Sequence, residues 1–173
     1  MNREAPRITV FDFFSGCGGT SAGFQEAGLD VVFALDNDRD AAKTYRFNFP
    51  AVIFCKKSIQ KMQDDDMQPA LDASKGSLKL FCGCAPCQPF TKQNTTMKER
   101  DQRAPLLREF GELVSKHMPH FVFVENVPGL QKVEGKYGPL NWFCRKLKEL
   151  NYDYDSKVVA AQDYGVAQIR RRF

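Results

Sequence analysis

Short apolar runs alternate with amphipathic segments along the chain, and this alternation is its strongest structural signal. Runs rich in β-branched and aromatic residues predict strands, whereas apolar positions that recur every three or four residues predict helices. The predicted strands cover residues 8–14, 31–35, 51–54, 78–81, 121–124 and 152–160. One predicted helix follows Thr20 and ends at Gly28, and the others cover residues 39–48, 106–116 and 139–150.

Strands that alternate with helices predict an α/β fold, built from βαβ units around a mostly parallel sheet. Because the apolar runs are continuous, we expect both faces of this sheet to be covered.

Two polar segments lack periodicity. Residues 60–77, with three consecutive aspartates at 64–66, are predicted to form a solvated loop that holds no metal. Residues 92–103 fit either a lid over a site or an ordinary loop.

The composition is that of an ordinary globular protein. The 173 residues are 43% hydrophobic and 27% charged, with a formal net charge of +4. At about 100–200 residues per domain, residues 1–173 are predicted to form a single domain that is neither disordered nor fibrous. No run approaches the ~20 apolar residues that cross a bilayer, and the first residues lack the apolar stretch of a signal peptide. We therefore expect a cytoplasmic protein that is not exported and has no membrane partner.

The six cysteines suggest reduced thiols rather than a disulfide framework. Cys82, Cys84 and Cys87 form a C-x-C-x-x-C cluster, but a zinc site usually needs a further ligand. Cys55 and Cys144 lie far away in apolar contexts, and a predicted helix separates both histidines from the cluster. The sequence therefore predicts no metal site, and it leaves room for one reactive thiol.

The residues best suited to chemistry follow the predicted strands. A glycine-rich turn at residues 14–19 follows the first strand, Asp36 follows the second, Cys87 the fourth and Glu125 the fifth. In parallel sheets, ligands bind beyond the carboxyl ends of the strands. We therefore expect these residues to converge on one edge of the sheet and to form a single site.

The first two of these signals also have structural interpretations. A glycine-rich turn lets backbone N–H groups approach a ligand, but this turn lacks the G-x-G-x-x-G spacing and is equally explained as a plain turn. Asp36 is placed to accept hydrogen bonds from the hydroxyls of a ribose. Asp38 competes for that role, or caps the helix that follows.

The later signals are ambiguous in the same way. Cys87, held between two prolines, serves as a nucleophile if its thiolate is stabilised, or is a packed structural cysteine. No histidine is placed to form a Cys–His pair, which disfavours a hydrolase. Glu125 fits a proton donor with a raised pKa, a helix cap or an exposed acid. Gln168, Arg170 and Arg172 would share one face of a strand, suited to phosphate or carboxylate groups or simply exposed.

In their order along the chain, these motifs resemble those of the cytosine-C5 DNA methyltransferases. Residues 12–19, Asp-Phe-Phe-Ser-Gly-Cys-Gly-Gly, resemble the first motif, and Asp36 stands where the family has its acidic ribose ligand. Residues 86–88 match the Pro-Cys-Gln motif and residues 125–127 the Glu-Asn-Val motif. Residues 168–172 resemble the Gln-x-Arg-x-Arg motif, and residues 163–165 resemble the segment that usually precedes it. The resemblance implies a Rossmann-like, S-adenosylmethionine-dependent methyltransferase fold with an incomplete sheet.

The resemblance also implies a mechanism and a set of catalytic residues. The thiolate of Cys87 would add to carbon 6 of a flipped cytosine, and carbon 5 would take the methyl group. Glu125 would hold the ring nitrogen and the exocyclic amine. Arg172, with Arg170, would orient the base or its phosphate and help to keep Cys87 ionised.

S-adenosyl-L-methionine is the implied cofactor and S-adenosyl-L-homocysteine the product. Phe14 would lie against the adenine, the glycine turn beside the methionine portion and Asp36 on the ribose. The implied cofactor-binding residues are Phe14, Ser15, Gly16, Cys17, Gly18, Gly19, Asp36, Asn37, Ser58, Pro86 and Leu106. Ser58 replaces a common aspartate, Asn37 an often apolar residue and Ala104 a usual glycine.

Members of the family continue beyond the last motif into a target-recognition region and a closing segment. We therefore expect DNA as one partner and a second polypeptide, or a part removed from the chain, as the source of these regions. The chain alone would then be poorly active. Two alternatives stay open: a non-catalytic, cofactor-binding or stimulatory subunit, and an RNA (tRNA) cytosine-C5 methyltransferase.

Overall fold

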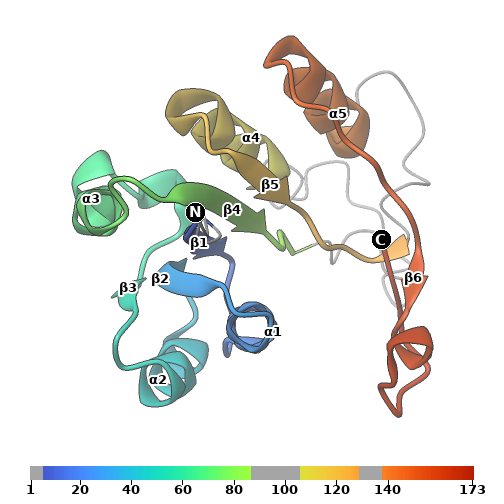
Figure 1. Ribbon diagram of the computed structural model, residues 1–173, viewed down its shortest axis with the longest axis horizontal. Helices are drawn as coiled ribbons and strands as arrows, with labels where there is room; N and C mark the ends of the chain where they lie inside the picture. The colour runs from blue at the N-terminus through green and yellow to red at the C-terminus, as the bar shows by residue number, and fades with distance from the viewer. Residues whose placement is uncertain (1–5, 87–105, 129–137) are drawn as a thin grey trace, which may run out of the picture. The chain divides into compact units, whose positions relative to one another are not determined.

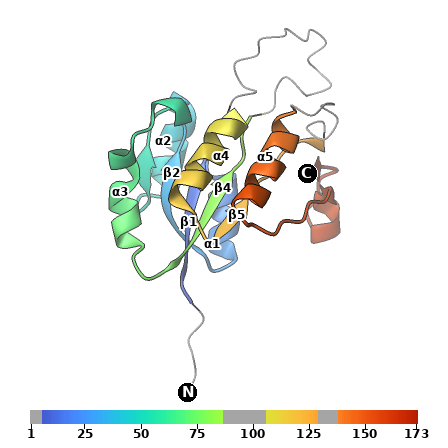
Figure 2. The ribbon, with the colours of Figure 1, turned by 90° about the horizontal axis from the view of Figure 1, so that it is seen from above.

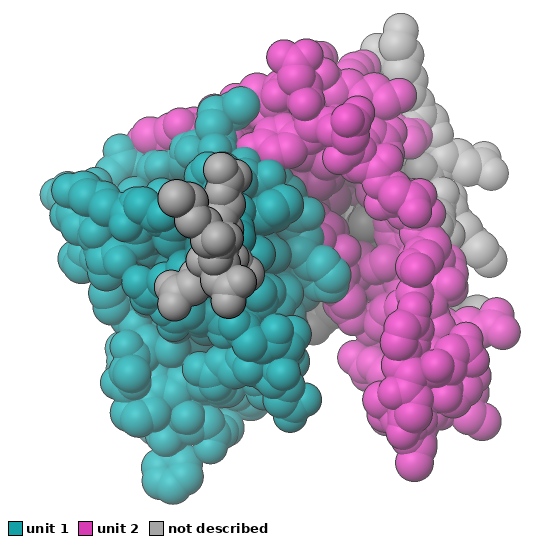
Figure 3. All heavy atoms as spheres, viewed as in Figure 1, with its two compact units in different colours: residues 1–84, 117–123 teal, residues 85–116, 124–173 magenta. Residues whose placement is uncertain are grey.

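The computed structural model describes residues 6–86, 106–128 and 138–173 (Figure 1). The chain divides into two compact units (Figure 3). The first unit contains residues 1–84 and 117–123, and the second contains residues 85–116 and 124–173.

The first unit is built on a five-stranded sheet with the strand order β3-β2-β1-β4-β5. Every neighbouring pair is parallel, as the alternation of strands and helices predicts. The strands are β1 (Ile8–Phe13), β2 (Asp30–Leu35), β3 (Ile53–Cys55), β4 (Leu78–Gly83) and β5 (Phe121–Phe123). The third strand begins two residues later than expected, and the predicted positions of the other four are confirmed.

Helices lie on both faces of this sheet. Figures 1 and 2 show α1 (Gly19–Glu26) and α2 (Arg39–Asn48) on one face and α3 (Asp64–Ala73) on the other. The predicted α1 and α2 are confirmed. Asp38 caps α2, because its carboxylate accepts the backbone N–H groups of Asp40 and Ala41 at 2.9 and 2.7 Å. The capping interpretation of Asp38 is therefore correct.

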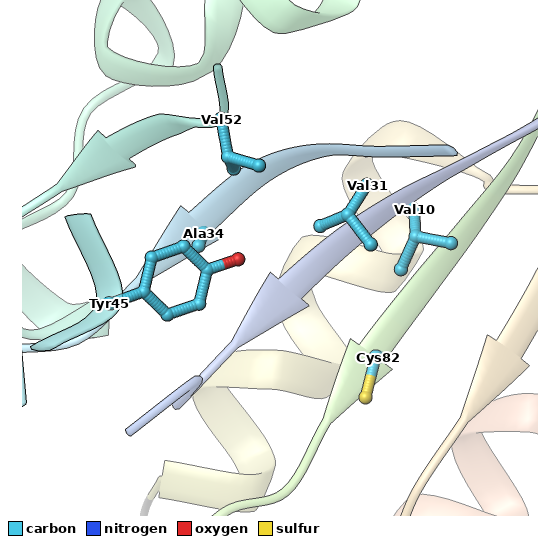
Figure 4. Close-up of a cluster of buried hydrophobic side chains, with 6 residues drawn as sticks. All are labelled: Val10, Val31, Ala34, Tyr45, Val52 and Cys82. Atoms are coloured by element: carbon cyan, nitrogen blue, oxygen red, sulfur yellow. The ribbon is translucent and has the colours of Figure 1, made fainter. Parts of the chain in front are cut away.

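Side chains of β1 are part of the hydrophobic core on both faces of the sheet. On the face of α1 and α2, buried residues of β1, β2, β4, α2 and the position before β3 form one cluster (Figure 4). Its members are Val10, Val31, Ala34, Tyr45, Val52 and Cys82. The alternate residues Phe11 and Phe13 meet Phe33 and Phe81, with ring centroids 5.1–6.0 Å apart. Both faces of β1 are therefore buried, which explains its continuous apolar run.

The segment predicted to be a loop, residues 60–77, instead contains a short 3-10 helix (Ile59–Lys61) and α3, so that prediction is wrong. The three aspartates form the first turn of α3, where negative charge is stabilised by the helix dipole. Asp66 also accepts the N–H of Gln63 at 2.9 Å and pairs with Lys57 at 2.7 Å. Only Met67 and Ala70 are buried in the helix, too few apolar positions to show a helical period.

The second unit contains two predicted helices, α4 (Leu106–His117, whose last residue belongs to the first unit) and α5 (Pro139–Glu149). The rings of Phe110 and Phe143 stack with centroids 5.9 Å apart. Gly111 lets the helices approach closely, since a Cβ there would lie 2.6 Å from the ring of Trp142. No helix in the described parts of the chain is long and apolar enough to span a membrane.

The strand predicted at residues 152–160 is mostly irregular, and that prediction is wrong. Only β6 (Val159–Ala160) is a strand, and it pairs antiparallel with β7 (Arg171–Arg172) in a separate two-stranded sheet. Residues 153–158 are exposed, and the carboxylate of Asp155 accepts the N–H of Ser156 in a local turn. The expected strand through Gln168 and Arg170 is likewise limited to Arg171–Arg172.

Candidate active site

The glycine-rich turn links the end of β1 to the start of α1. Phe14, Gly16 and Gly18 all have positive φ angles, of 64°, 53° and 97°. The N–H of Gly18 donates to the carbonyl of Ser15 at 2.9 Å, and the N–H of Ser15 donates to the carbonyl of Leu35 at 3.0 Å. Phe14 therefore holds a conformation that costs a non-glycine residue about 1 kcal/mol or more, and such strain is common at functional sites.

The glycines of this turn serve different purposes. A Cβ at Gly18 would lie 2.3 Å from the ring of Phe49 and 3.1 Å from that of Tyr45, so Gly18 is required by packing against α2. Gly16 and Gly19 have nothing within 4 Å of an added Cβ. Their surroundings are open, which fits a turn whose backbone is approached by a ligand.

Asp36 joins the end of β2 to this turn. Its Oδ2 accepts the N–H of Gly16 at 2.8 Å, and its Oδ1 accepts the N–H of Asp38 at 2.9 Å. The Asp36 carboxylate is partly exposed and each oxygen keeps a further lone pair. It can therefore accept ribose hydroxyls while it fixes the turn, and the residues present fit the nucleoside of S-adenosylmethionine. The neighbouring Asn37 is exposed.

Beneath the turn lies a buried polar network that the motifs alone did not predict. The hydroxyl of Ser21, on α1, donates to Asp12 Oδ2 at 2.6 Å and lies 2.7 Å from the hydroxyl of Tyr45, on α2. Because the Ser21 proton is directed to Asp12, the Tyr45 hydroxyl donates to Ser21. Burial raises the pKa of Asp12 to about 6, against the lowering effect of the Ser21 hydrogen bond. The sequence did contain one sign of this network, because a carboxylate inside an apolar strand is unusual and needs polar partners.

The other expected cofactor residues are described to different extents. Ser15 is buried and Cys17 exposed in the turn itself. Ser58 is half-buried and precedes the 3-10 helix, and its carbonyl accepts the N–H groups of Lys61 and Met62 at 2.9 and 3.1 Å. Pro86 is exposed and Leu106 is half-buried at the start of α4. Their part in cofactor binding stays a prediction.

In the second unit, Glu125 and Arg172 form an ion pair. Glu125 Oε1 lies 2.6 Å from Arg172 Nε, and the two side chains are 33% and 24% exposed, so the pair is partly shielded from water. The Arg172 guanidinium also donates to the carbonyl of Arg171 at 2.8 Å. The structure thus brings together two of the four predicted catalytic residues. Arg170 is exposed, with its carbonyl accepting the N–H of Ala161 at 2.7 Å.

Asn126 ties three of the motifs together, and sequence reasoning did not assign it a role. Its N–H and carbonyl exchange hydrogen bonds with Phe173 at 2.6 and 2.8 Å, which holds the last motif beside Glu125. Its side chain donates to the carbonyl of Ala85 at 3.1 Å and accepts the N–H of Val127 at 2.8 Å. Ala85 directly precedes the Pro-Cys-Gln motif. Asn126 is 3% exposed, so all of these hydrogen bonds are buried or nearly so.

Cys87 lies outside the described residues, as do Ala104 and the polar segment 92–103. Of the cluster around it, Cys82 and Cys84 are free thiols with their sulfurs 3.8 Å apart. The hydrogen bond to Cys84 and burial raise the pKa of Cys82 well above its ordinary value. Within the described ranges, no three His, Cys, Asp or Glu side chains gather as metal ligands.

Known proteins are similar to this chain over most of its length. It is 34% identical over 164 residues to the Type II methyltransferase M.XorII of Xanthomonas oryzae, covering 93% of this chain and 38% of that protein. It is 31% identical to the Type II methyltransferase M1.BsuMI of Bacillus subtilis, covering 96% of this chain and 42% of that protein. The chain thus spans about two fifths of the length of these relatives.

A similar solved structure is that of a candidate DNA modification methyltransferase encoded within an Escherichia coli prophage. It superposes with a TM-score of 0.79 and is 32% identical, covering 95% of this chain and 44% of that one. The expected methyltransferase fold, Rossmann-like with a partial sheet, is thereby confirmed. The family model of the C-5 cytosine-specific DNA methylases matches residues 8–173. The chain belongs to the C-5 cytosine-specific DNA methylase family.

Proposed function

We propose that the chain carries the catalytic part of an enzyme that transfers a methyl group from S-adenosylmethionine to carbon 5 of cytosine in DNA. Family membership supports the reaction class. The observation that carries the proposal is the Glu125–Arg172 ion pair, held in register by the two backbone hydrogen bonds between Asn126 and Phe173. This pair joins two ordered motifs, which a fold without catalytic function would have no chemical reason to keep paired.

The cofactor site is proposed at the carboxyl ends of β1 and β2. Asp36 would accept the ribose hydroxyls, the open backbone at Gly16 and Gly19 would lie beside the methionine portion, and Phe14 would contact the adenine. The full proposed set also includes Ser15, Cys17, Gly18, Asn37, Ser58, Pro86 and Leu106. S-adenosylmethionine supplies, when bound, a methyl group made electrophilic by its sulfonium.

Cys87 is proposed as the nucleophile, since carbon 5 of cytosine is too weak a nucleophile by itself. The thiolate sulfur would form a bond to carbon 6, and the electron pair of the C5–C6 double bond would move through carbon 5 toward N3. Carbon 5 would then take the methyl group, and the sulfonium that supplies it would become a neutral thioether. Loss of the carbon 5 proton to a base would restore the double bond and expel the thiolate.

Glu125 and Arg172 would stabilise the negative charge that develops on the cytosine ring. Glu125 is proposed to hold N3 and the exocyclic amine, where a proton offsets the negative charge that addition of the thiolate creates. Arg172 pairs with Glu125 at 2.6 Å and so fixes the direction of its carboxyl group. Arg170, which is exposed, would meet a phosphate or the base.

DNA is the proposed macromolecular partner, and the target base would leave the duplex before it reaches the site. A DNA substrate places the reaction inside the cell, as the sequence analysis expects. A second polypeptide that supplies target recognition also stays a prediction. Mass spectrometry of proteins that co-purify with the chain would test it.

Trapping of a covalent intermediate tests the proposal. The chain, with any co-purified partner, is incubated with S-adenosylmethionine and, in separate reactions, with a DNA duplex or an RNA that contains 5-fluorocytosine. The reaction cannot remove the fluorine from this base. We expect a denaturation-resistant complex with wild type and none with Cys87→Ser, while both proteins bind the cofactor equally. Trapping on RNA alone would favour the RNA alternative. Cofactor binding without trapping on either nucleic acid would favour the non-catalytic subunit.

A further inference from the structure

Asp12 is a buried carboxylate without a counter-charge. It is 0% exposed, and its Oδ1 has no hydrogen-bond partner. Its neighbours in the sheet are Ala34 on β2 and Cys82 on β4, an apolar residue and a buried thiol. An isolated ionised carboxylate in such surroundings is costly, and proteins normally pair it or neutralise it.

The groups that act most on the Asp12 carboxyl come from each element packed around it, and none is a cation. The Ser21 hydroxyl on α1 donates a hydrogen bond to the carboxyl, and the thiol of Cys82 on β4 and the backbone N–H of Ser21 also lower the pKa of Asp12 by hydrogen bonding. Asp36, after β2, adds a second negative charge. Tyr45 on α2 reaches Asp12 through Ser21. The described residues therefore leave this end of β1 with uncompensated negative charge.

The same network connects Asp12 to the glycine-rich turn. Ser21 lies in the first turn of α1, two residues after Gly19. Gly18 lies near Tyr45, the outer member of the network, since a Cβ added at Gly18 would lie 3.1 Å from the Tyr45 ring. Asp36, the second carboxylate, accepts the N–H of Gly16 in the turn itself. Both carboxylates are thus linked to the turn through short hydrogen-bonded paths.

We propose that Asp12 is a positioning residue of the cofactor site, whose buried negative charge favours a cationic ligand over a neutral one at the glycine-rich turn. This inference rests on the proposed function, in which S-adenosylmethionine binds at that turn. The cofactor carries a sulfonium cation, and its product S-adenosylhomocysteine carries a neutral thioether in its place. Asp12 would therefore strengthen binding of the reactant and ease release of the product.

A purely structural role would not require a carboxylate. An asparagine at this position offers a carbonyl oxygen that accepts the Ser21 hydroxyl equally well, and it carries no charge to desolvate. Groups that lower stability persist where they serve a function. The unpartnered Oδ1 of Asp12 is such a group.

Binding calorimetry on the whole chain tests the inference, with wild type, Asp12→Asn and the surface control Asp72→Asn. Asp72 is an exposed carboxylate of α3 whose partners are Lys75 and Gln68. At pH 7 we expect Asp12→Asn to weaken S-adenosylmethionine binding about tenfold, which corresponds to a coupling of about one pKa unit between the Asp12 carboxylate and the bound cation. Binding of S-adenosylhomocysteine should weaken less than about threefold on the same coupling argument. Asp72→Asn should bind both as wild type does.

The pH profile of the wild type gives a second readout that needs no variant. Burial raises the pKa of Asp12 to about 6. If the cation binds the ionised form about tenfold more tightly than the protonated form, its apparent affinity rises about fivefold between pH 5 and pH 7. The accompanying release of a proton is measured from the buffer dependence of the binding enthalpy. Asp12→Asn should lose this proton release, and Asp72→Asn should keep it.

Three results would overturn the inference. Unchanged affinities and an unchanged pH profile in Asp12→Asn would exclude any role of the charge. If the variant does not fold, the absence of proton release attributable to Asp12 in the wild type would exclude it as well. An equal loss of affinity for both ligands would show that Asp12 only maintains the shape of the turn. Failure of wild type to bind either ligand would overturn the proposed function itself, and the inference with it.

Discussion

Replacing Asp12 with asparagine should stabilise the protein at neutral pH, because it removes a buried charge and keeps an acceptor for the Ser21 hydroxyl. Asp12 has a pKa of about 6 in the folded protein and a reference value of 3.8. The folded state therefore binds the proton more tightly than the unfolded state does. Stability associated with this group is fully present below about pH 4, is lost as the pH rises through 6, and stays lost above it.

The size of this effect follows from the difference between the two pKa values. About two pKa units, at 1.36 kcal/mol each, correspond to about 3 kcal/mol of destabilisation at neutral pH. The side chain is fully buried, so solvent screening does not reduce this figure greatly. The asparagine side chain would imitate the protonated acid and escape the cost. The free energy of unfolding of Asp12→Asn minus that of wild type should therefore rise by about 2–3 kcal/mol from pH 4 to pH 7.5.

Urea unfolding at several pH values measures this difference. The comparison between the two proteins cancels the contribution of all other titrating groups. The control Asp72→Asn, which replaces an exposed carboxylate, should show no such rise in the free-energy difference. A difference that stays constant with pH would refute the reasoning, since Asp12 would then have the same pKa in both states. A difference that falls with pH would mean that the ionised form has a cationic partner.

Three further substitutions test packing around the site, each by urea unfolding. Gly18→Ala should cost about 3 kcal/mol or more, because its φ is 97° and the new Cβ would overlap an aromatic ring of α2. Gly111→Ala should cost about 1 kcal/mol, since overlap with Trp142 outweighs the gain in helix propensity. Gly23→Ala, where an added Cβ meets nothing within 4 Å, is its control and should not destabilise. Asn126→Ala should cost about 2–4 kcal/mol, because two buried partners lose their hydrogen bonds.

Most of the sheet could be predicted because each strand is a short apolar run that is buried on both sides. The run at residues 8–14 predicted β1 almost to the residue, and the helix at residues 39–48 was predicted with Asp38 as one candidate for its cap. The helix α3 could not be predicted in this way. Its stability comes from the dipole, the Asp66 contacts and only two buried residues, none of which produces an apolar period.

The order of the motifs predicts a set of site residues, of which the structure brings Glu125 and Arg172 together, but it does not predict which side chains support them. The Glu125–Arg172 pair joins two residues that both belong to recognised motifs. Tyr45 lies outside every motif, and its contact with Ser21 depends on how α2 packs over α1. Contacts of this kind depend on tertiary packing between elements, which a single sequence does not specify.

Asp12, in the first unit, and Asn126, in the second, are both buried polar side chains, and they differ in a way that separates support from recognition. Asn126 uses its backbone and side-chain groups in hydrogen bonds within the protein, so its role is complete without a ligand. Asp12 is equally buried, but one of its oxygens has no partner and its charge is uncompensated. A protein gains rigidity from the first arrangement and loses stability from the second. The second is therefore the one that a bound cation would make favourable.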